Sequence, residues 1–314
     1  MIINRNIVLT IVTLLATSVL PVSAKTFYWI SHGSPADPVW TYFLAGARQW
    51  EADTGHTVNT SFHNGDVASH QEAVRAAISA QADGIVSSSP DPGSLIDVAR
   101  EANEERIPII NMNTPDRTAT FDAYVGGDLV EVGRTWAQYL VDRGLVKSGD
   151  FVWTPVEVPG ATYGVQEEQG IASVFEPLGI TWEVTDNTLD QAEVITRMVD
   201  YLTANGHRVD GIIGLGDLVT GSIKRVFDQC GISPREIPVV GWGNSLDTTK
   251  EVLMGYVNAA MWQDPQATSY LGLSLALMAS SGIPPEFDII TGALYEADTA
   301  HIYDHILSAD GIRE

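Results

Sequence analysis

The chain has 314 residues, of which 17 are Lys or Arg and 40 are Asp or Glu, so its formal net charge is −23. This excess of acid excludes the clustered basic surface of a nucleic-acid-binding protein, and a hydrophobic content of 45% excludes a disordered chain. The single cysteine, Cys230, excludes an internal disulfide framework and a cysteine-rich metal site.

Residues 1–24 have the pattern of a secretory signal peptide. Arg5 supplies the basic start, an apolar stretch covers 7–20, and small residues end at Ala24. We therefore expect cleavage after Ala24 and a periplasmic location. An uncleaved membrane anchor is the alternative, but this stretch is shorter than the ~20 apolar residues that a span needs. Further along, Leu271–Met278 is the most apolar segment, and its short length favours a buried helix.

Strands and helices alternate through the next hundred residues. Helix 39–54, for example, places Trp40, Phe43 and Trp50 on one face. An alternation of this kind predicts a parallel sheet with helices on both faces. The elements expected here are strands Thr26–Ser31, Thr57–Phe62, Gly84–Ser88 and Ile107–Met112, and helices Val39–Thr54, Ala68–Gln81 and Gly93–Glu104.

A second α/β series follows, and its start near Tyr124–Gly127 marks the expected domain boundary. Two such series fit the length, at roughly 100–200 residues per domain. Ser280–Pro285, with a glycine and two prolines, predicts a late turn or crossing. The strands expected in this series are Asp150–Trp153, Thr181–Val184, Gly211–Leu215, Val239–Trp242 and Tyr256–Met261, and the helices are Leu129–Arg143, Tyr163–Leu178, Ala192–Asn205 and Leu218–Cys230.

Polar side chains and tryptophans recur directly after the predicted strands. In open α/β sheets, ligands bind beyond the carboxyl ends of the strands. Amides and carboxylates pair with hydroxyl groups, and indole rings cover the C–H face of a sugar, so this composition favours an uncharged, polyhydroxylated ligand. No metal-binding spacing is present, and we expect no metal and no cofactor. The residues that follow strands include His32, Asp37, Trp40, Asp91, Asn113, Glu157, Tyr163, Asp217, Asn244 and Gln263.

Six sequence phrases resemble a known family when they are taken together and in order. The chain resembles the type I periplasmic solute-binding proteins of ABC sugar importers, in the ribose/galactose/xylose-binding group related to LacI-type sensor domains. The resemblance extends from Lys25 to Leu307. The phrases are Asp37-Pro38-Val39-Trp40, the runs 81–86, 102–111 and 124–128, Ile237-Pro238-Val239-Val240-Gly241-Trp242, and Gln263-Asp264-Pro265.

The resemblance implies two doubly wound parallel-sheet α/β lobes that are joined by a three-strand hinge and close over a monosaccharide. It implies a first lobe of residues 25–125 plus 265–287 and a second lobe of 126–264 plus 288–314. The ligand-binding residues that we expect are His32, Asp37, Trp40, Asp91, Asn113, Tyr163, Asp217, Asn244 and Gln263. Trp40 is expected to stack on the ring, with Trp262 or Trp153 assisting.

Several positions depart from the family pattern. Val39 replaces the first aromatic of the helix-one motif, Asn113-Thr114 replaces an Asp-Arg pair, and Val165-Gln166 stands where an Arg is usual. The loss of guanidinium groups from these positions again indicates a neutral ligand.

The function that we expect is capture of a monosaccharide or polyol by a monomeric, non-enzymatic receptor that delivers it to an ABC transporter permease. The alternative is a signal receptor that presents its ligand to a membrane sensor kinase, since both roles use the same lobe tips. A secreted hydrolase is disfavoured because no nucleophile elbow or Ser/His/Asp constellation is evident. The export signal disfavours a LacI-type repressor.

Overall fold

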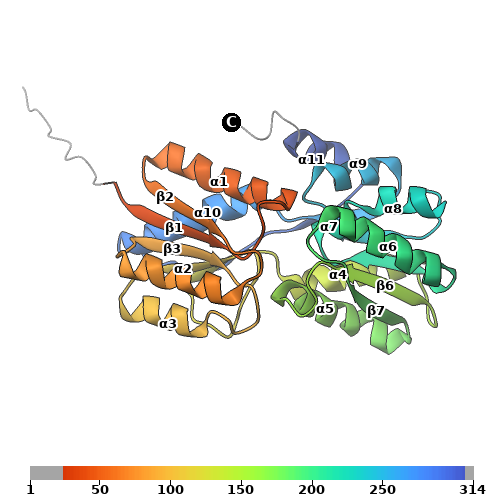
Figure 1. Cartoon of the computed structure of the whole chain (residues 1–314), viewed down its shortest axis with the longest axis horizontal. Coiled ribbons are helices and arrows are strands. Elements are labelled where there is room, and N and C mark those ends of the chain that lie inside the picture. Colours follow the sequence, from red (N-terminus) through yellow and green to blue (C-terminus); the bar gives the residue numbers. More distant parts are fainter. Residues whose placement is uncertain (1–23, 308–314) are drawn as a thin grey trace, which may run out of the picture.

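Two lobes lie side by side in the computed structural model, which describes residues 24–307 (Figure 1). The expected signal peptide, 1–24, falls almost entirely outside these residues. Each lobe is built on a six-stranded sheet with helices on both faces. No helix within residues 24–307 is long and apolar enough to cross a membrane.

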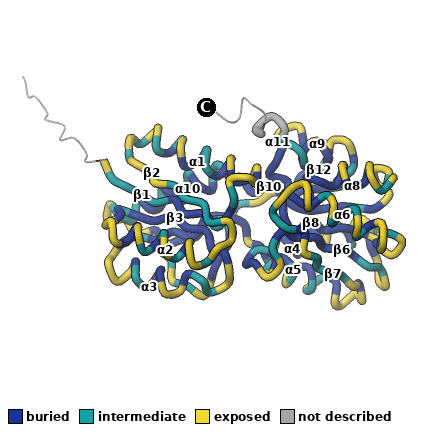
Figure 2. The backbone as a smooth tube through the Cα atoms, in the orientation of Figure 1, coloured by how far each residue is buried: buried dark blue, intermediate teal, exposed yellow. Residues whose placement is uncertain are grey.

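The first lobe contains the entirely parallel sheet, in the order β11-β5-β4-β3-β1-β2. Its strands β3, β4 and β5 are buried along their whole length. In Figure 2, dark blue tube fills the interior of this lobe around the β3 label. Its elements are β1 (Thr26–Ser31), α1 (Pro38–Thr54), β2 (Thr57–Phe62), α2 (Val67–Ser79), β3 (Gly84–Ser88), α3 (Ile96–Glu104), β4 (Ile109–Met112), β5 (Ala123–Gly126), α10 (Pro265–Ser280) and β11 (Ile289–Ile290).

The second lobe has the strand order β12-β10-β9-β8-β6-β7, in which only β12 is antiparallel to its neighbour. Its elements are α4 (Leu129–Asp142), β6 (Phe151–Val156), α5 (Thr162–Leu178), β7 (Thr181–Asp186), α6 (Gln191–Asn205), a 3-10 turn (Gly206–Arg208), β8 (Gly211–Gly214), α7 (Asp217–Thr220), α8 (Ile223–Cys230), β9 (Val239–Trp242), α9 (Leu246–Met254), β10 (Ala259–Trp262), β12 (Ala293–Glu296) and α11 (Ala300–Leu307).

The chain crosses between the lobes three times, after β5, after β10 and after β11. At the first crossing Gly126 adopts a φ of 154°, and a Cβ atom there would lie 2.3 Å from the Tyr124 hydroxyl oxygen, so only glycine fits. These features confirm the expected fold, two doubly wound lobes with a three-strand hinge. The last crossing falls later than we expected, because Ile289–Ile290 still pairs with β5 rather than joining the second lobe at 288.

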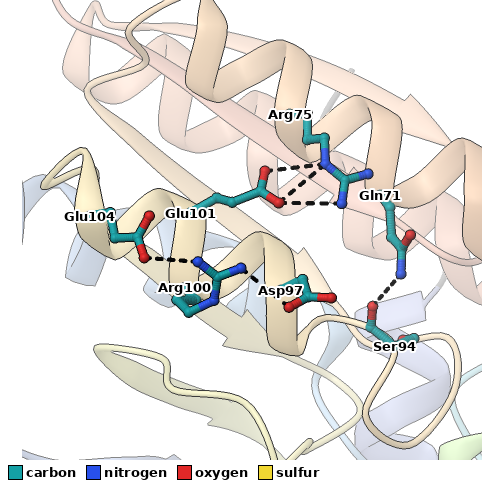
Figure 3. Close-up of polar contacts among 7 residues, drawn as sticks. All are labelled: Gln71, Arg75, Ser94, Asp97, Arg100, Glu101 and Glu104. Carbon is teal, nitrogen blue, oxygen red and sulfur yellow. Dashed lines mark hydrogen bonds and ion pairs between the residues drawn. The ribbon is translucent and has the colours of Figure 1, made fainter.

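Helix α10 returns late in the chain to complete the first lobe, where it lies in blue among red and orange elements in Figure 1. Its backbone approaches α1 so closely that a Cβ on Gly46 would be 2.0 Å from the Gln266 carbonyl oxygen. On another surface of this lobe, α2 and α3 are linked by the ion pair of Arg75 with Glu101, at 3.1 Å (Figure 3). The first lobe is therefore assembled from segments far apart in sequence.

Most predicted elements occur within a few residues of their expected bounds, but one does not. The helix expected at Leu218–Cys230 is broken into α7 and α8 around Gly221. The Thr220 hydroxyl donates to the Gly216 carbonyl oxygen at 2.7 Å, and the Ser222 hydroxyl donates to the Leu218 carbonyl oxygen at 2.8 Å. These side-chain bonds compete with the helical ladder and favour a turn there.

Candidate ligand-binding site

A cavity of about 110 Å³ lies between the lobes. This volume is far above the ~10–15 Å³ that a single water requires, so the cavity has room for more than one water molecule or for a small ligand. All nine residues expected to bind ligand line it: His32, Asp37, Trp40, Asp91, Asn113, Tyr163, Asp217, Asn244 and Gln263. The structure therefore brings the whole predicted set together, while the ligand contacts themselves stay a prediction.

The wall from the first lobe is built on the loop after β1 and on the start of α1. The Asp37 carboxylate caps α1 by accepting from the Val39 N–H at 3.2 Å. Trp40, one helical position further, packs edge-on against the His32 ring at 5.0 Å and lies against Phe43 at 4.7 Å between ring centroids. A Cβ on Gly33 would overlap the Trp40 ring at 2.0 Å, so glycine leaves room for the indole.

A chain of hydrogen bonds runs across the hinge side of the cavity. The Asn113 amide donates to Gln263 Oε1 at 3.3 Å, and the Gln263 N–H donates to Asn244 Oδ1 at 2.8 Å. The Asn244 N–H then donates to Asp217 Oδ1 at 2.6 Å. Gln263 is only 3% exposed, and its Nε2 has no partner among the described residues. An unpaired buried amide donor that lines a cavity requires an acceptor from a ligand or from water.

The wall from the second lobe is organised around Glu157. Its Oε1 accepts from the N–H groups of Leu218 and Val219, at 3.0 and 3.1 Å, at the start of α7. Its Oε2 accepts from the Tyr163 hydroxyl at 3.3 Å. We noted Glu157 as a residue that follows a strand but did not include it among the expected ligand-binding residues.

Burial controls the charge of this site. Desolvation raises the pKa of Glu157 to about 7 and that of Asp217 to about 6. Burial and the charges of Glu157 and Asp217 raise the pKa of Asp37 well above its ordinary value. Burial also lowers the pKa of His32 to about 4, so this imidazole is neutral at pH 7. The lining residues include neither Lys nor Arg.

The second indole of the cavity is Trp242, and the expectation that Trp153 or Trp262 assists Trp40 is wrong. Trp153 is fully buried in the core of the second lobe, where it stacks on Tyr201 at 4.3 Å. Trp262 packs against Tyr303 at 5.2 Å. Trp242 lines the cavity instead, and its Nε1 donates to Glu167 Oε1 at 2.8 Å.

The lobes contact each other beside the cavity. Gln166 Nε2 donates across the gap to the Pro115 carbonyl oxygen at 2.7 Å, and the Thr162 N–H donates to the Pro90 carbonyl oxygen at 3.4 Å. Tyr42 of α1 is buried in the apolar cluster of the second lobe. These contacts describe a closed arrangement of the two lobes.

Exposure differs among the predicted residues. Asp91 is exposed at the rim, whereas Trp40, Asp37, Asp217, Asn244 and Gln263 are buried. The residues that sequence reasoning missed are mostly apolar, and they include Phe43, Leu129, Val158, Leu189, Leu215 and Trp242. Within residues 24–307, no group of three or more His, Cys, Asp or Glu side chains is placed to hold a metal ion.

A two-lobed α/β fold with a hinge, and with a largely apolar, tryptophan-lined cavity that carries several polar side chains between the lobes, defines a binding protein that closes around a small ligand. The comparison with family models agrees, since the periplasmic binding protein domain matches residues 27–283. The chain belongs to this family, which confirms the relationship expected from its sequence. No curated protein sequence matches the chain significantly.

Several solved structures share the fold at low sequence identity. An ABC transporter solute-binding protein from Burkholderia graminis, in complex with D-arabinose, is 20% identical with a TM-score of 0.79, covering 88% of this chain and 96% of its own. A galactofuranose-binding protein is 17% identical with a TM-score of 0.81, covering 90% and 98%. A carbohydrate transporter from Acidothermus cellulolyticus, in complex with myo-inositol, is 18% identical with a TM-score of 0.78, covering 92% and 100%.

Proposed function

We propose that this protein is a periplasmic receptor that captures a monosaccharide or related polyol between its lobes and delivers it to an ABC transporter permease. The observation that carries the proposal is the cavity itself, in which Trp40 and Trp242 accompany the Asn113–Gln263–Asn244 hydrogen-bond chain. Indole rings suit the C–H face of a sugar, and amides suit its hydroxyl groups. The arabinose, galactofuranose and myo-inositol named for the three similar structures support this ligand class.

The receptor binds without chemistry in this proposal. The ligand enters the open cleft, contacts both lobes and favours closure because it binds the closed form more tightly. The carboxylates of Asp37, Glu157 and Asp217 accept hydrogen bonds there, and no nucleophile takes part. The signal peptide at 1–24 would direct the chain to the periplasm, where it works as a monomer.

Thermal-shift screening against aldoses, deoxy sugars and polyols tests the ligand class, because a ligand raises stability by mass action. Positive compounds are then measured by calorimetry with wild type and Gln263→Ala, and the ligand is recovered and analysed. We expect recovery of unchanged ligand and about tenfold weaker binding by the variant, since a neutral hydrogen bond contributes about 0.5–1.5 kcal/mol. Equal affinity in the two proteins would remove Gln263 from the site, and recovery of a converted ligand would show an enzyme.

The transport role is tested in cells that lack the gene. Loss of uptake of the labelled ligand, restored by the wild-type gene, is the expected result. Normal uptake together with loss of a ligand-induced transcriptional response would instead support the sensor-kinase alternative.

A further inference from the structure

Three buried carboxyl groups line the cavity. Asp37 comes from the first lobe, whereas Glu157 and Asp217 come from the second, and none of the three is more than 9% exposed. The negative charges of Glu157 and Asp217 raise the pKa of Asp37 on the opposite lobe. The charge of Asp217 also raises the pKa of Glu157 within the second lobe. Their mutual repulsion opposes closure of the lobes whenever they are ionised.

No protein cation balances these carboxylates. The residues that line the cavity include no Lys or Arg, and the one base, His32, is held neutral by burial. None of the ion pairs found among residues 24–307 involves Asp37, Glu157 or Asp217. Buried charges are normally paired or else neutralised by protonation, and the raised pKa values of these carboxyl groups correspond to the second case. A cationic group on the ligand would therefore let them ionise as it binds.

The remaining hydrogen-bonding capacity shows where that charge would be held. Glu157 is already satisfied by two backbone N–H groups and the Tyr163 hydroxyl. Asp37 accepts one bond, from the Val39 N–H, and its second oxygen has no donor in the described part of the chain. The buried Nε2 of Gln263, by contrast, lacks an acceptor. The cavity therefore has room for a donor beside Asp37 and for an oxygen acceptor beside Gln263 Nε2.

We propose that the ligand is an amine-bearing sugar or polyol, whose protonated amine is held between Asp37 of the first lobe and Asp217 of the second, with Glu157 nearby. This inference rests on the proposed function and revises the neutral ligand that the sequence indicated. The hydroxyl groups of the ligand supply the acceptor for Gln263 Nε2. An ammonium group has three donors and one positive charge, so it removes the repulsion between the lobes as it bridges them.

A neutral hydroxyl at the same place would donate only one hydrogen bond and would offer no positive charge to the carboxyl groups. Charge-assisted hydrogen bonds are roughly twice as strong as neutral ones. We therefore expect an amino compound to bind about ten- to a hundredfold more tightly than its parent hydroxyl compound.

The test is calorimetry at pH 7 with wild type and matched sets of ligands. Each set contains a neutral sugar or polyol, its amino-deoxy derivative and the N-acetylated form of that derivative, such as glucose, glucosamine and N-acetylglucosamine, or sorbitol and its 1-amino-1-deoxy derivative. The expected result is a set in which the amine binds at least about tenfold more tightly than both uncharged members. Neutral members that bind as tightly as their amines would overturn this inference and leave the proposed function intact. Failure of every hydroxylated compound to bind would overturn both.

Two carboxamide variants locate the amine contact. Asp37→Asn keeps the cap of α1, because Asn caps helices as well as Asp does, and Asp217→Asn changes the opposite lobe. Each should weaken binding of the amine about tenfold or more and should weaken binding of the neutral parent by a clearly smaller factor, because only the amine loses a charge-assisted contact. Asp97→Asn, on the exposed surface of α3 (Figure 3), is the matched control and should change neither affinity. Equal losses for amine and parent in the Asp37 and Asp217 variants would contradict the amine contact.

Discussion

Glu251 gives the clearest prediction about the stability of this protein, because it is a carboxyl group buried away from the cavity. It lies on α9 with 4% of its surface exposed, and its Oε2 has no hydrogen-bond partner in the described residues. Burial raises the pKa of Glu251 to about 8, from an ordinary value of 4.5. The folded state therefore keeps a proton on Glu251 over a pH range in which the unfolded chain has lost it.

The sign of the effect follows from proton linkage. Between pH 4.5 and 8 the folded protein binds more protons than the unfolded chain, so the free energy of unfolding falls as the pH rises. The contribution is fully present below pH 4.5 and is lost on passing through pH 8. From pH 5 to pH 8, at 1.36 kcal/mol per pKa unit, Glu251 alone accounts for a loss of about 3 kcal/mol.

Urea unfolding of the ligand-free protein at pH 5, 6, 7 and 8 measures this loss. Glu251→Gln removes the titrating group with little change of shape. Between pH 5 and pH 8, the free energy of unfolding of this variant should therefore fall by about 3 kcal/mol less than that of wild type. The other buried carboxyl groups titrate in both proteins and cancel in the comparison. Glu105→Gln, at an exposed position, is the control and should follow wild type. Parallel pH profiles for wild type and Glu251→Gln would refute the reasoning.

Three further predictions concern the cavity wall, the closed form and the packing of the second lobe. Trp40→Ala should lower the free energy of unfolding by about 3–5 kcal/mol in addition to weakening ligand binding, because the ring is only 5% exposed. Trp40→Phe should retain most of the stability in the same urea unfolding measurement, and an Ala variant as stable as wild type would contradict the predicted loss. Gln166→Ala removes the 2.7 Å bond to Pro115 and should weaken ligand binding up to about tenfold by calorimetry with an unchanged melting temperature; unchanged affinity would mean that the bond does not favour closure. Gly133→Ala places a Cβ 2.0 Å from the Glu167 carbonyl oxygen. The resulting overpacking of α4 against α5 should lower the free energy of unfolding by at least about 1–3 kcal/mol, measured by thermal unfolding. A melting temperature equal to that of wild type would contradict this prediction.

The strand-end rule predicted much of the cavity, because it depends only on chain direction and on polar residues in sequence. His32, Asn113 and Asn244 follow strands, and all three line the cavity. The rule fails where a strand is longer than predicted. Strand β6 continues to Val156, so Trp153 lies in its middle and its side chain packs under a helix instead of lining the cavity.

Trp242 shows the opposite failure. It is the last residue of β9, and its indole contacts Trp136 edge-on at 5.3 Å as part of the apolar core. In sequence it is one more apolar residue of a buried strand, so nothing marks it as part of the cavity. Leu129 and Leu215 are similar, because apolar lining is defined by tertiary packing and carries no local signature.

The late return of α10 to the first lobe has a consequence for synthesis of the protein. The strands from β6 to β10 and their helices form one continuous stretch, so most of the second lobe can assemble as soon as that stretch has left the ribosome. The first lobe cannot complete its packing until Pro265–Ser280 has been translated, since α10 packs against its β3 and α1. Until then, the N-terminal part of the nascent chain exposes the apolar face that α10 later covers. Chaperones that bind exposed apolar surface can act on this lobe for longer than on the second lobe.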